Sequence, residues 1–258
     1  MRHTDQKTNI LYLLYIYRFL NRNQIQSLLH HKQFNRVIIW LNELTNEGNI
    51  RRYYNPKWVT VPAVYSLGVK GRKYLKDHTD VKDVNPVLLD RIWRERNVST
   101  QFRKHCQFIA DIYLSLTALT EKTKATLHFY TKTSLYGMQY LILPNPDAYF
   151  SITEAKGNKA YYFLDIFDDL PARMALRKRI RQYIEYYEND YWQDHTRKPF
   201  PNIILVAPDD RFKNYLYRQI PKMLDNESEL HFYLSTWEKI KTMGICKETL
   251  QIVEPQDR

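Results

Sequence analysis

The most constraining feature of this sequence is a run of helix signals between residues 23 and 48. Asn23, a good helix N-cap residue, precedes a short segment whose apolar residues have helical spacing. Residues 34–47 carry a second apolar stripe, and Gly48 follows at the position of a C′ glycine. The sequence therefore predicts two short, consecutive helices. The second of them is expected to bury Val37, Ile38, Leu41 and Leu44.

A pair of strands and one more helix follow these two helices. Residues 50–54 and 58–67 are rich in β-branched and aromatic residues and flank a turn signal at residues 55–57, which favours a β-hairpin. Residues 71–76 have the pattern of a short basic helix, and residues 7–20 that of an apolar first helix. Helices followed by a hairpin and a helix are the order of a winged helix-turn-helix, which we predict for this part of the chain.

Positive charge is concentrated in the same region. Residues 1–77 contain 13 Lys and Arg against 4 Asp and Glu, so they hold +9 of the formal net charge of +11. Such a region neutralises phosphates, and its binding should weaken steeply with salt. We therefore expect double-stranded DNA as the partner, with a purely protein-binding winged helix as the alternative. The expected DNA contacts are Asn35, Arg36 and Asn42 on the second helix and Arg51, Arg52 and Lys57 on the hairpin.

The remainder of the chain has the pattern of an α+β or α/β domain with a mixed sheet. Residues 78–97 are polar, mixed in charge and interrupted by a proline, which predicts a linker with a short helix. Residues 98–258 then alternate between helical and strand-like patterns, which predicts one further domain. Its expected helices are 99–119, 171–190 and 211–224, and its expected strands are 126–130, 139–143, 147–152, 160–166, 202–207 and 231–234.

Two carboxylates of this second domain are candidates for metal binding. Asp147 begins one predicted strand, and Asp165 ends the next. If these strands pair, both carboxylates emerge at one edge of the sheet, where they could bind Mg²⁺. The alternative is that Asp147 is a turn residue after Pro146 and that Asp165 helps to cap the following helix.

A series of short motifs resembles the replication-relaxation family of plasmid and mobile-element proteins. The resemblance covers nearly the whole chain, and its specificity comes from the succession of the motifs rather than from any one of them. The motifs are the winged-helix start, residues 65–71, the helix around His105, residues 143–150, residues 162–166, the basic helix that reaches Tyr183, and residues 202–206.

The resemblance implies a fold, a site and a biological role. It implies a second domain similar to restriction endonucleases, whose signature is Pro-Asp followed by Asp or Glu, any residue, and Lys. By that resemblance Asp147 and Asp165 are the metal ligands, and the protein acts in plasmid replication or mobilisation, with replication or mobilisation proteins as further partners. A Mg²⁺-dependent endonuclease or nickase and a winged-helix transcription regulator are the alternatives.

The chain departs from this signature at the lysine. Phe167 stands at that position and cannot activate a water molecule. Lys178, on the next predicted helix, is the credible substitute, since Arg179 is always charged and makes a poor base. The expected catalytic set is therefore Asp147, Asp165 and Lys178, and the missing lysine leaves both an active endonuclease and an inactive nuclease-like domain open.

The helix after Asp165 is itself basic. It carries five positive charges within nine residues, and a solvated helix face would usually mix charges of both signs. A second nucleic-acid contact and a solvated basic helix are both open, and the contact residues in the first case are Arg177, Lys178 and Arg181.

Other features narrow the class of protein. Cys106 and Cys246 lack the spacing of metal ligands, which is typical of a reduced, cytoplasmic protein. No apolar run approaches the ~20 residues that span a bilayer, so no membrane is expected as a partner. A lone histidine such as His105 is more often an ordinary surface or core residue than a ligand. The broad apolar face of residues 7–20 predicts burial against either a second subunit, as in a homodimer, or the second domain.

Overall fold

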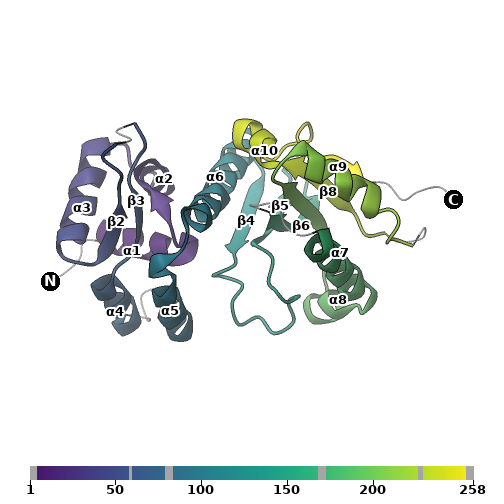
Figure 1. Ribbon diagram of the computed structural model, residues 1–258, viewed down its shortest axis with the longest axis horizontal. Helices are drawn as coiled ribbons and strands as arrows, with labels where there is room; N and C mark the ends of the chain where they lie inside the picture. Colours follow the sequence, from purple (N-terminus) through teal and green to yellow (C-terminus); the bar gives the residue numbers. More distant parts are fainter. Residues whose placement is uncertain (1–4, 58–59, 79–83, 168–172, 226–228, 254–258) are drawn as a thin grey trace. The chain divides into compact units, whose positions relative to one another are not determined.

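The computed structural model is a mixed α+β protein (Figure 1). It describes all residues except 1–4, 58–59, 79–83, 168–172, 226–228 and 254–258. The chain divides into two compact units, Met1–Leu114 and Ser115–Arg258, and the division lies within the long helix α6 (Thr100–Thr123). The domain limits expected from the sequence, 1–77, 78–97 and 98–258, stay a prediction.

The first unit combines helices with a small antiparallel sheet. Its sheet has the order β1-β3-β2, so β3 is the middle strand (Figure 1). Within it, β2 and β3 form the predicted hairpin. The elements are α1 (Asp5–Tyr17), β1 (Leu20–Asn21), α2 (Arg22–Leu28), α3 (Phe34–Asn46), β2 (Ile50–Tyr53), β3 (Val64–Leu67), α4 (Val69–Asp77), α5 (Pro86–Ile92), a 3-10 helix (Trp93–Asn97) and the first half of α6.

The residues that flank two helices confirm the sequence prediction at the end of α3 and correct it at the start of α2. Gly48 follows α3 with φ of +76°, as a C′ glycine does, so that prediction is confirmed. The N-cap of α2, however, is Asn21 and not Asn23. Asn21 accepts from the backbone of Gln24, whose side chain accepts from the backbone N–H of Asn21, and this capping box starts the helix two residues early.

Helix α3 has one buried and one exposed face. Val37, Leu41 and Leu44 are fully buried, as the spacing predicted. Trp40 is also buried and Ile38 only half-buried, so the prediction of Ile38 rather than Trp40 on the core face was wrong. The indole of Trp40 contacts the ring of His31, in the loop before α3, edge-on with 4.9 Å between ring centroids.

The second strand of the hairpin is shorter than expected. β3 begins at Val64 rather than at residue 58, and residues 58–59 lie outside the described part of the chain. Strand β1, which pairs with β3, was not predicted because two residues carry no strand periodicity. His105 of α6 is buried, as the core alternative for this residue required.

The second unit is built on a six-stranded sheet of order β4-β5-β6-β7-β8-β9. The β6–β7 and β7–β8 pairs are parallel and the other pairs antiparallel, so the predicted mixed sheet is confirmed. The elements are β4 (Thr126–Thr131), β5 (Ala148–Thr153), β6 (Lys159–Ile166), α7 (Arg173–Glu188), α8 (Tyr191–Thr196), β7 (Asn202–Ala207), α9 (Asp210–Gln219), β8 (Phe232–Thr236), α10 (Trp237–Met243) and β9 (Gln251–Val253).

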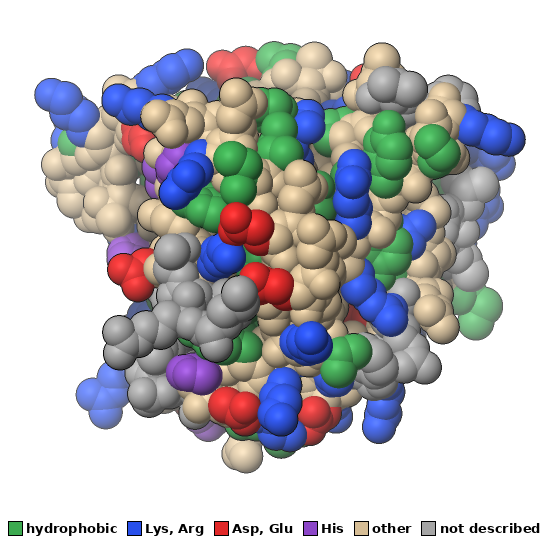
Figure 2. Space-filling model, turned by 90° about the vertical axis from the view of Figure 1, so that its left-hand side faces the viewer, with side chains coloured by type: hydrophobic (Ala, Val, Ile, Leu, Met, Phe, Trp, Pro, Cys, Tyr) green, Lys and Arg blue, Asp and Glu red, His purple; other side chains and the backbone are tan. Residues whose placement is uncertain are grey.

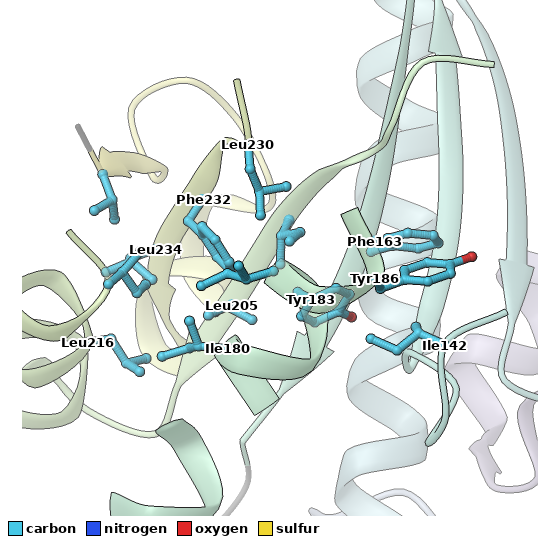
Figure 3. Packing of buried hydrophobic residues seen from close by; sticks show 14 of the residues in the cluster. Ile142, Phe163, Ile180, Tyr183, Tyr186, Leu205, Leu216, Leu230, Phe232 and Leu234 are labelled. Carbon is cyan, nitrogen blue, oxygen red and sulfur yellow. The ribbon is translucent and has the colours of Figure 1, made fainter. Parts of the chain in front are cut away.

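One face of this sheet forms the main core of the unit. Phe163 of β6, Leu205 of β7 and Phe232 of β8 lie on that face and pack against Ile180 and Tyr183 of α7 (Figure 3). All five side chains are fully buried. At about 25 cal/mol per Å² of apolar area, each large side chain of this kind contributes roughly 1.5–3 kcal/mol, so the core fixes α7 against the sheet.

One sequence prediction for this unit needs correction, and two elements were missed. Residues 139–143, expected as a strand, form a loop, in which Tyr140 packs against Trp192 at 6.1 Å between ring centroids. The apolar residues of that loop pack into the core without forming a strand. Helix α8 and strand β9 were not predicted, while Pro171, expected in the first turn of α7, lies outside the described residues. No described helix combines the length and the apolar character that crossing a bilayer requires.

Candidate functional site

The two predicted carboxylates occupy opposite positions at the end of neighbouring strands. Ala148 is opposite Leu164 in the antiparallel β5–β6 pair, and the N–H of Asp147 donates to the carbonyl of Leu164 at 2.9 Å. Continuing this register by one residue sets Asp147 opposite Asp165. Alternate residues share a face of a strand, so both carboxylates lie on the face that α7 covers. Both are buried, at 9% and 6% exposure.

Asp165 is fully engaged by two side chains of α7. The guanidinium of Arg179 donates through Nε to Oδ2 and through Nη2 to Oδ1 at 3.3 Å, which is a bidentate pair. The hydroxyl of Tyr183 donates to Oδ2 at 3.0 Å. Arg179 and Tyr183 are four residues apart and therefore project from the same face of the helix. Both oxygens of Asp165 are thus satisfied by protein donors.

Arg179 is held in place by further partners. Its Nη1 donates to the carbonyl of Pro144 at 2.8 Å, and its Nη2 to the hydroxyl of Tyr183 at 3.0 Å. Burial has the largest single effect on the pKa of the guanidinium and lowers it, but the charges of Asp165 and Tyr183 and the hydrogen bonds to both together raise that pKa above its usual value. Burial, reinforced by Asp165, raises the pKa of Tyr183 well above its usual value. The cluster is therefore an ion pair with a neutral tyrosine.

Asp147 has different partners from Asp165. Its Oδ2 accepts from the backbone N–H of Ile166 at 2.9 Å, and its Oδ1 lies 3.6 Å from the ammonium of Lys132. The Lys132 side chain is about half exposed, so this ion pair is weak compared with that of Asp165. The backbone bond instead ties the start of β5 to the end of β6 and orients the carboxylate.

Both carboxylates line one cleft of about 360 Å³. Lys178, the predicted catalytic lysine, is exposed at its rim, and Phe167, which replaces the signature lysine, also lines it. A magnesium ion binds carboxylate oxygens that have no other partner. Both oxygens of Asp165 already accept hydrogen bonds from Arg179. Across the described residues, which omit 168–172, no three His, Cys, Asp or Glu side chains are grouped to hold a metal. The arrangement present does not fit Mg²⁺.

The other predicted contacts of α7 are on its exposed face. Arg177, Lys178 and Arg181 are all exposed, whereas Arg179 points into the sheet. Arg177 is partly committed, because its Nη2 donates to the side chain of Gln219 at 2.7 Å and its guanidinium lies 5.9 Å from the ring of Tyr215. The basic run of α7 is therefore divided between a buried ion pair and an exposed basic surface.

In the first unit, the predicted contacts on α3 lie on its exposed face. Asn35, Arg36 and Asn42 are all exposed. Ile39 and Asn46 are exposed as well, and their spacing from Asn35 places them in the same stripe as Asn42. The stripe therefore consists of three amides and one aliphatic side chain, and Ile39 is 45% exposed.

The basic residues of the first unit fall into two groups. Lys7 pairs with Glu43 at 2.9 Å, Lys76 pairs with Asp90 at 3.1 Å, and Arg18 pairs with Glu95. By contrast, several exposed basic side chains make no ion pair with a described residue. Lys32, Arg36, Arg52 and Lys57 lie near the start of α3 and on the hairpin, whereas Lys70, Lys73, Arg94 and Lys104 lie on α4, the 3-10 helix and α6.

Charge alone does not delimit a binding face on this unit. In the view of Figure 2, Lys and Arg side chains stand separately and acidic side chains lie between some of them. Part of the surplus of +9 expected from the sequence is thus paired within the protein, as for Lys7 and Arg18. The ion pairs remove Lys7 and Arg18 from the candidate contacts, but exposed basic side chains without an acidic partner among the described residues remain on several elements, so charge does not select α3 and the hairpin.

Sequence reasoning missed several residues of these sites. Arg179 was considered only as a base, and its pairing with Asp165 was not foreseen; the i, i+4 spacing of Arg179 and Tyr183 was the available signal. Lys132 had no signal, because it lies in a loop and approaches Asp147 only through the fold. Asn46 could have been found by extending the stripe of Asn35 and Asn42 by one turn.

Comparisons with known proteins place the chain in a family. The structure of the restriction endonuclease FokI aligns with 95% of this chain at 12% identity and a TM-score of 0.34, which is too distant a likeness to carry an argument. The chain spans 45% of the length of FokI. A comparison with curated proteins gives no match. The model of the replication-relaxation family matches residues 11–203, well over half of the chain, and this protein therefore belongs to the replication-relaxation family.

Proposed function

We propose that this protein binds duplex DNA of a plasmid or other mobile element and acts in its replication or mobilisation. The proposal treats the first unit as a winged helix-turn-helix with α3 as the recognition helix. The observation that carries it is the exposed stripe of α3, where three amides surround an aliphatic side chain that the protein leaves 45% exposed. An apolar residue exposed among amides suits a surface that reads base edges.

The chemistry of the stripe suits the major groove. An asparagine amide can form a bidentate pair with adenine, and an aliphatic side chain can contact the methyl group of thymine. Asn35, Ile39 and Asn42 occupy successive turns of α3, as a helix in the groove requires. Arg36, whose guanidinium lies 5.8 Å from the Trp40 ring, would hold a phosphate beside the bases.

The hairpin would supply backbone contacts. Arg52 is exposed on β2 and lies 4.9 Å from the ring of Tyr54, while Lys57 is exposed in the loop that follows. In that loop the side chain of Asn55 accepts from the backbone N–H of Lys57 at 3.0 Å, which orders the turn. Arg51 and Arg52 with Lys57 would contact phosphates or the minor groove.

Charge reversal of the hairpin tests this assignment. The double variant Arg51→Glu, Arg52→Glu should abolish binding to a labelled duplex, measured by fluorescence anisotropy at moderate salt. The matched control is Lys239→Glu, Lys241→Glu, which changes the net charge equally at two exposed positions of the second unit. Unchanged affinity in the hairpin variant would refute the assignment. Footprinting of the DNA around the protein's own gene would reveal a compact operator if the protein were instead a transcription regulator.

For the second unit we propose a restriction-endonuclease-like fold that does not cleave. The support is the engagement of Asp165 by Arg179, whose guanidinium supplies the positive charge that a metal ion would otherwise bring. Breaking a buried ion pair of this kind costs about 3–5 kcal/mol, which opposes its displacement by Mg²⁺.

The alternative is a Mg²⁺-dependent endonuclease or nickase that uses Asp147, Asp165 and Lys178. One observation favours it, namely that these three residues line the same cleft. Supercoiled plasmid incubated with Mg²⁺ or Mn²⁺ separates the two proposals. We expect no nicked product, and nicking that disappears in Asp165→Ala would establish the nuclease instead.

A further inference from the structure

A second pocket of the Ser115–Arg258 unit has no assigned role. Its volume is about 250 Å³, and it shares no lining residue with the cleft of Asp147 and Asp165. Strands β4, β5 and β6 contribute its floor, and the loop at residues 135–141 and helix α8 contribute its walls. The volume lies below the roughly 300–1,000 Å³ of drug-sized ligand sites, so the pocket suits a single ring system.

Aromatic side chains form much of the lining. Tyr130 of β4 and Tyr149 of β5 stack at 5.9 Å between centroids, and Trp192 of α8 meets Tyr149 edge-on at 5.2 Å. Tyr140 of the loop approaches Trp192 at 6.1 Å. Tyr149 and Trp192 are buried and fixed by the core, whereas Tyr130 is 38% exposed at the opening. The pocket therefore presents preformed aromatic surface that needs little ordering when a flat ring binds.

Two lysines add positive charge to this aromatic surface. The ammonium groups of Lys159 and Lys198 lie 5.4 Å and 5.9 Å from the ring centroid of Tyr161, so both stand beside the same tyrosine. Both lysines line the pocket, and no lining residue is acidic. Neither lysine makes an ion pair with any residue in the described part of the chain.

We propose that this pocket binds one unstacked nucleobase, with its phosphate held by Lys159 and Lys198, and that a single-stranded nucleic acid supplies it. Aromatic rings that stack a base beside cations that hold its phosphate are the two elements of single-strand recognition. The absence of acidic lining residues disfavours a cationic ring as ligand. Ser151 and Thr196 provide hydroxyl groups that can bond the edge of the base.

The test compares two probes that differ only in their bases. Fluorescence anisotropy of the full-length protein is measured with a labelled oligothymidylate and with an abasic strand of equal length. Tyr130→Ala removes a stacking ring worth about 1–3 kcal/mol, so affinity for oligothymidylate should fall about tenfold and affinity for the abasic strand should not change. Tyr217→Ala, at a residue of α9 that is 39% exposed, is the matched control and should leave both affinities unchanged.

A second variant keeps the test independent of any effect of Tyr130→Ala on folding. Lys159→Ala, Lys198→Ala alters two long side chains at the surface and should weaken both strands, whereas Lys156→Ala, Lys247→Ala should weaken neither. Equal loss for both strands in Tyr130→Ala, or no loss in the Lys159 and Lys198 variant, would overturn the proposal.

Two further measurements locate the site and identify the source of the nucleotide. Photocrosslinking of a strand that carries 5-iodouracil should attach it to peptides that contain Tyr130, Tyr140 or Trp192, and crosslinks confined to Met1–Leu114 would contradict the site. Competition with thymidine monophosphate distinguishes a strand from a free nucleotide. If thymidine monophosphate displaces the labelled strand only at a far higher concentration than unlabelled oligothymidylate does, the ligand is a strand. If both displace it at equal concentration, the pocket is assigned to the free nucleotide.

Discussion

Two arginines on helices, one in each unit, have opposite environments. Arg179 of α7 is buried and bound to Asp165, Pro144 and Tyr183. Arg36 of α3 is exposed, contacts the Trp40 ring and has no ion pair with a described residue. Their difference shows that the fold, and not the charge of the sequence, decides which basic side chains are exposed to a polyanion.

The same contrast separates the two proposed functions. On α3 and the hairpin, exposed side chains are available for a polyanion, and binding should depend on salt. Where β5 begins and β6 ends, buried groups satisfy one another, and their effect should appear in stability and not in DNA affinity. Substitutions on α3 and the hairpin should therefore change DNA affinity, and substitutions around Asp165 should change stability. The opposite result in either region would contradict this comparison.

The largest effect is expected from Arg179→Met. The variant leaves the carboxylate of Asp165 buried without its cation, which should lower the free energy of unfolding by about 3–5 kcal/mol. Urea denaturation followed by circular dichroism measures this loss. Arg181→Met, at an exposed position two residues away, should change stability by no more than about 0.5 kcal/mol. Equal stability of the two variants would show that the ion pair is not formed.

A smaller change in stability is expected from Asp165→Asn, and its direction distinguishes an ion pair from an empty metal site. The amide keeps the shape but removes the charged partner of Arg179, so stability should fall by about 1.5–3 kcal/mol. In an empty metal site, two facing carboxylates repel each other, and the same substitution would raise stability instead. Thermal unfolding of the wild type and the variant, with and without Mg²⁺, distinguishes the ion pair from the empty metal site. Stabilisation of the wild type by Mg²⁺ would support the nuclease.

On the exposed side of the comparison, Asn42→Ala should weaken binding to a cognate duplex by about 1–3 kcal/mol through the loss of one bidentate base contact. Since no phosphate contact is lost, the dependence of affinity on salt should not change. The control is Asn189→Ala, at an exposed position in the second unit. Anisotropy titrations at several salt concentrations give both quantities, and a changed salt dependence would assign Asn42 to the phosphates.

The smallest effect at neutral pH is expected from Tyr183→Phe. Loss of one hydrogen bond to Asp165 should lower stability by about 1 kcal/mol at pH 7. Burial raises the pKa of Tyr183, so above pH 10 the unfolded chain loses this proton while the folded protein retains it. Wild-type stability should therefore be unaffected below pH 10 and fall above it, by up to about 1.4 kcal/mol per pH unit for this residue.

The variant tests that linkage directly. Phenylalanine has no proton to lose, so the alkaline slope of Tyr183→Phe should be shallower than that of the wild type. Some slope should persist, because burial also raises the pKa of Tyr17, Tyr149 and Tyr186. Urea denaturation between pH 8 and pH 11 measures both slopes, and identical slopes would mean that Tyr183 is not buried as a neutral group.

Helical periodicity made much of the first unit predictable. The apolar spacing of α3 placed Val37, Leu41 and Leu44 in the core, and Gly48 marked its end. These features are local, because a helix repeats every 3.6 residues and its cap lies next to it in sequence. Elements too short to show a period were missed, as with β1, and the apolar loop around Tyr140 imitated a strand.

The sequence by itself determined the succession of helices and strands, the surplus of positive charge, and the placement of Asp147 and Asp165 at strand ends. Only the tertiary structure decided that Asp165 binds Arg179, and that Lys7 and Arg18 are paired while Arg36 and Lys57 make no ion pair with a described residue. It also decided that aromatic residues from four segments line one pocket. Local conformation depends on neighbours in sequence, whereas the partner of a charged or aromatic side chain depends on which distant elements the packing brings into contact with it.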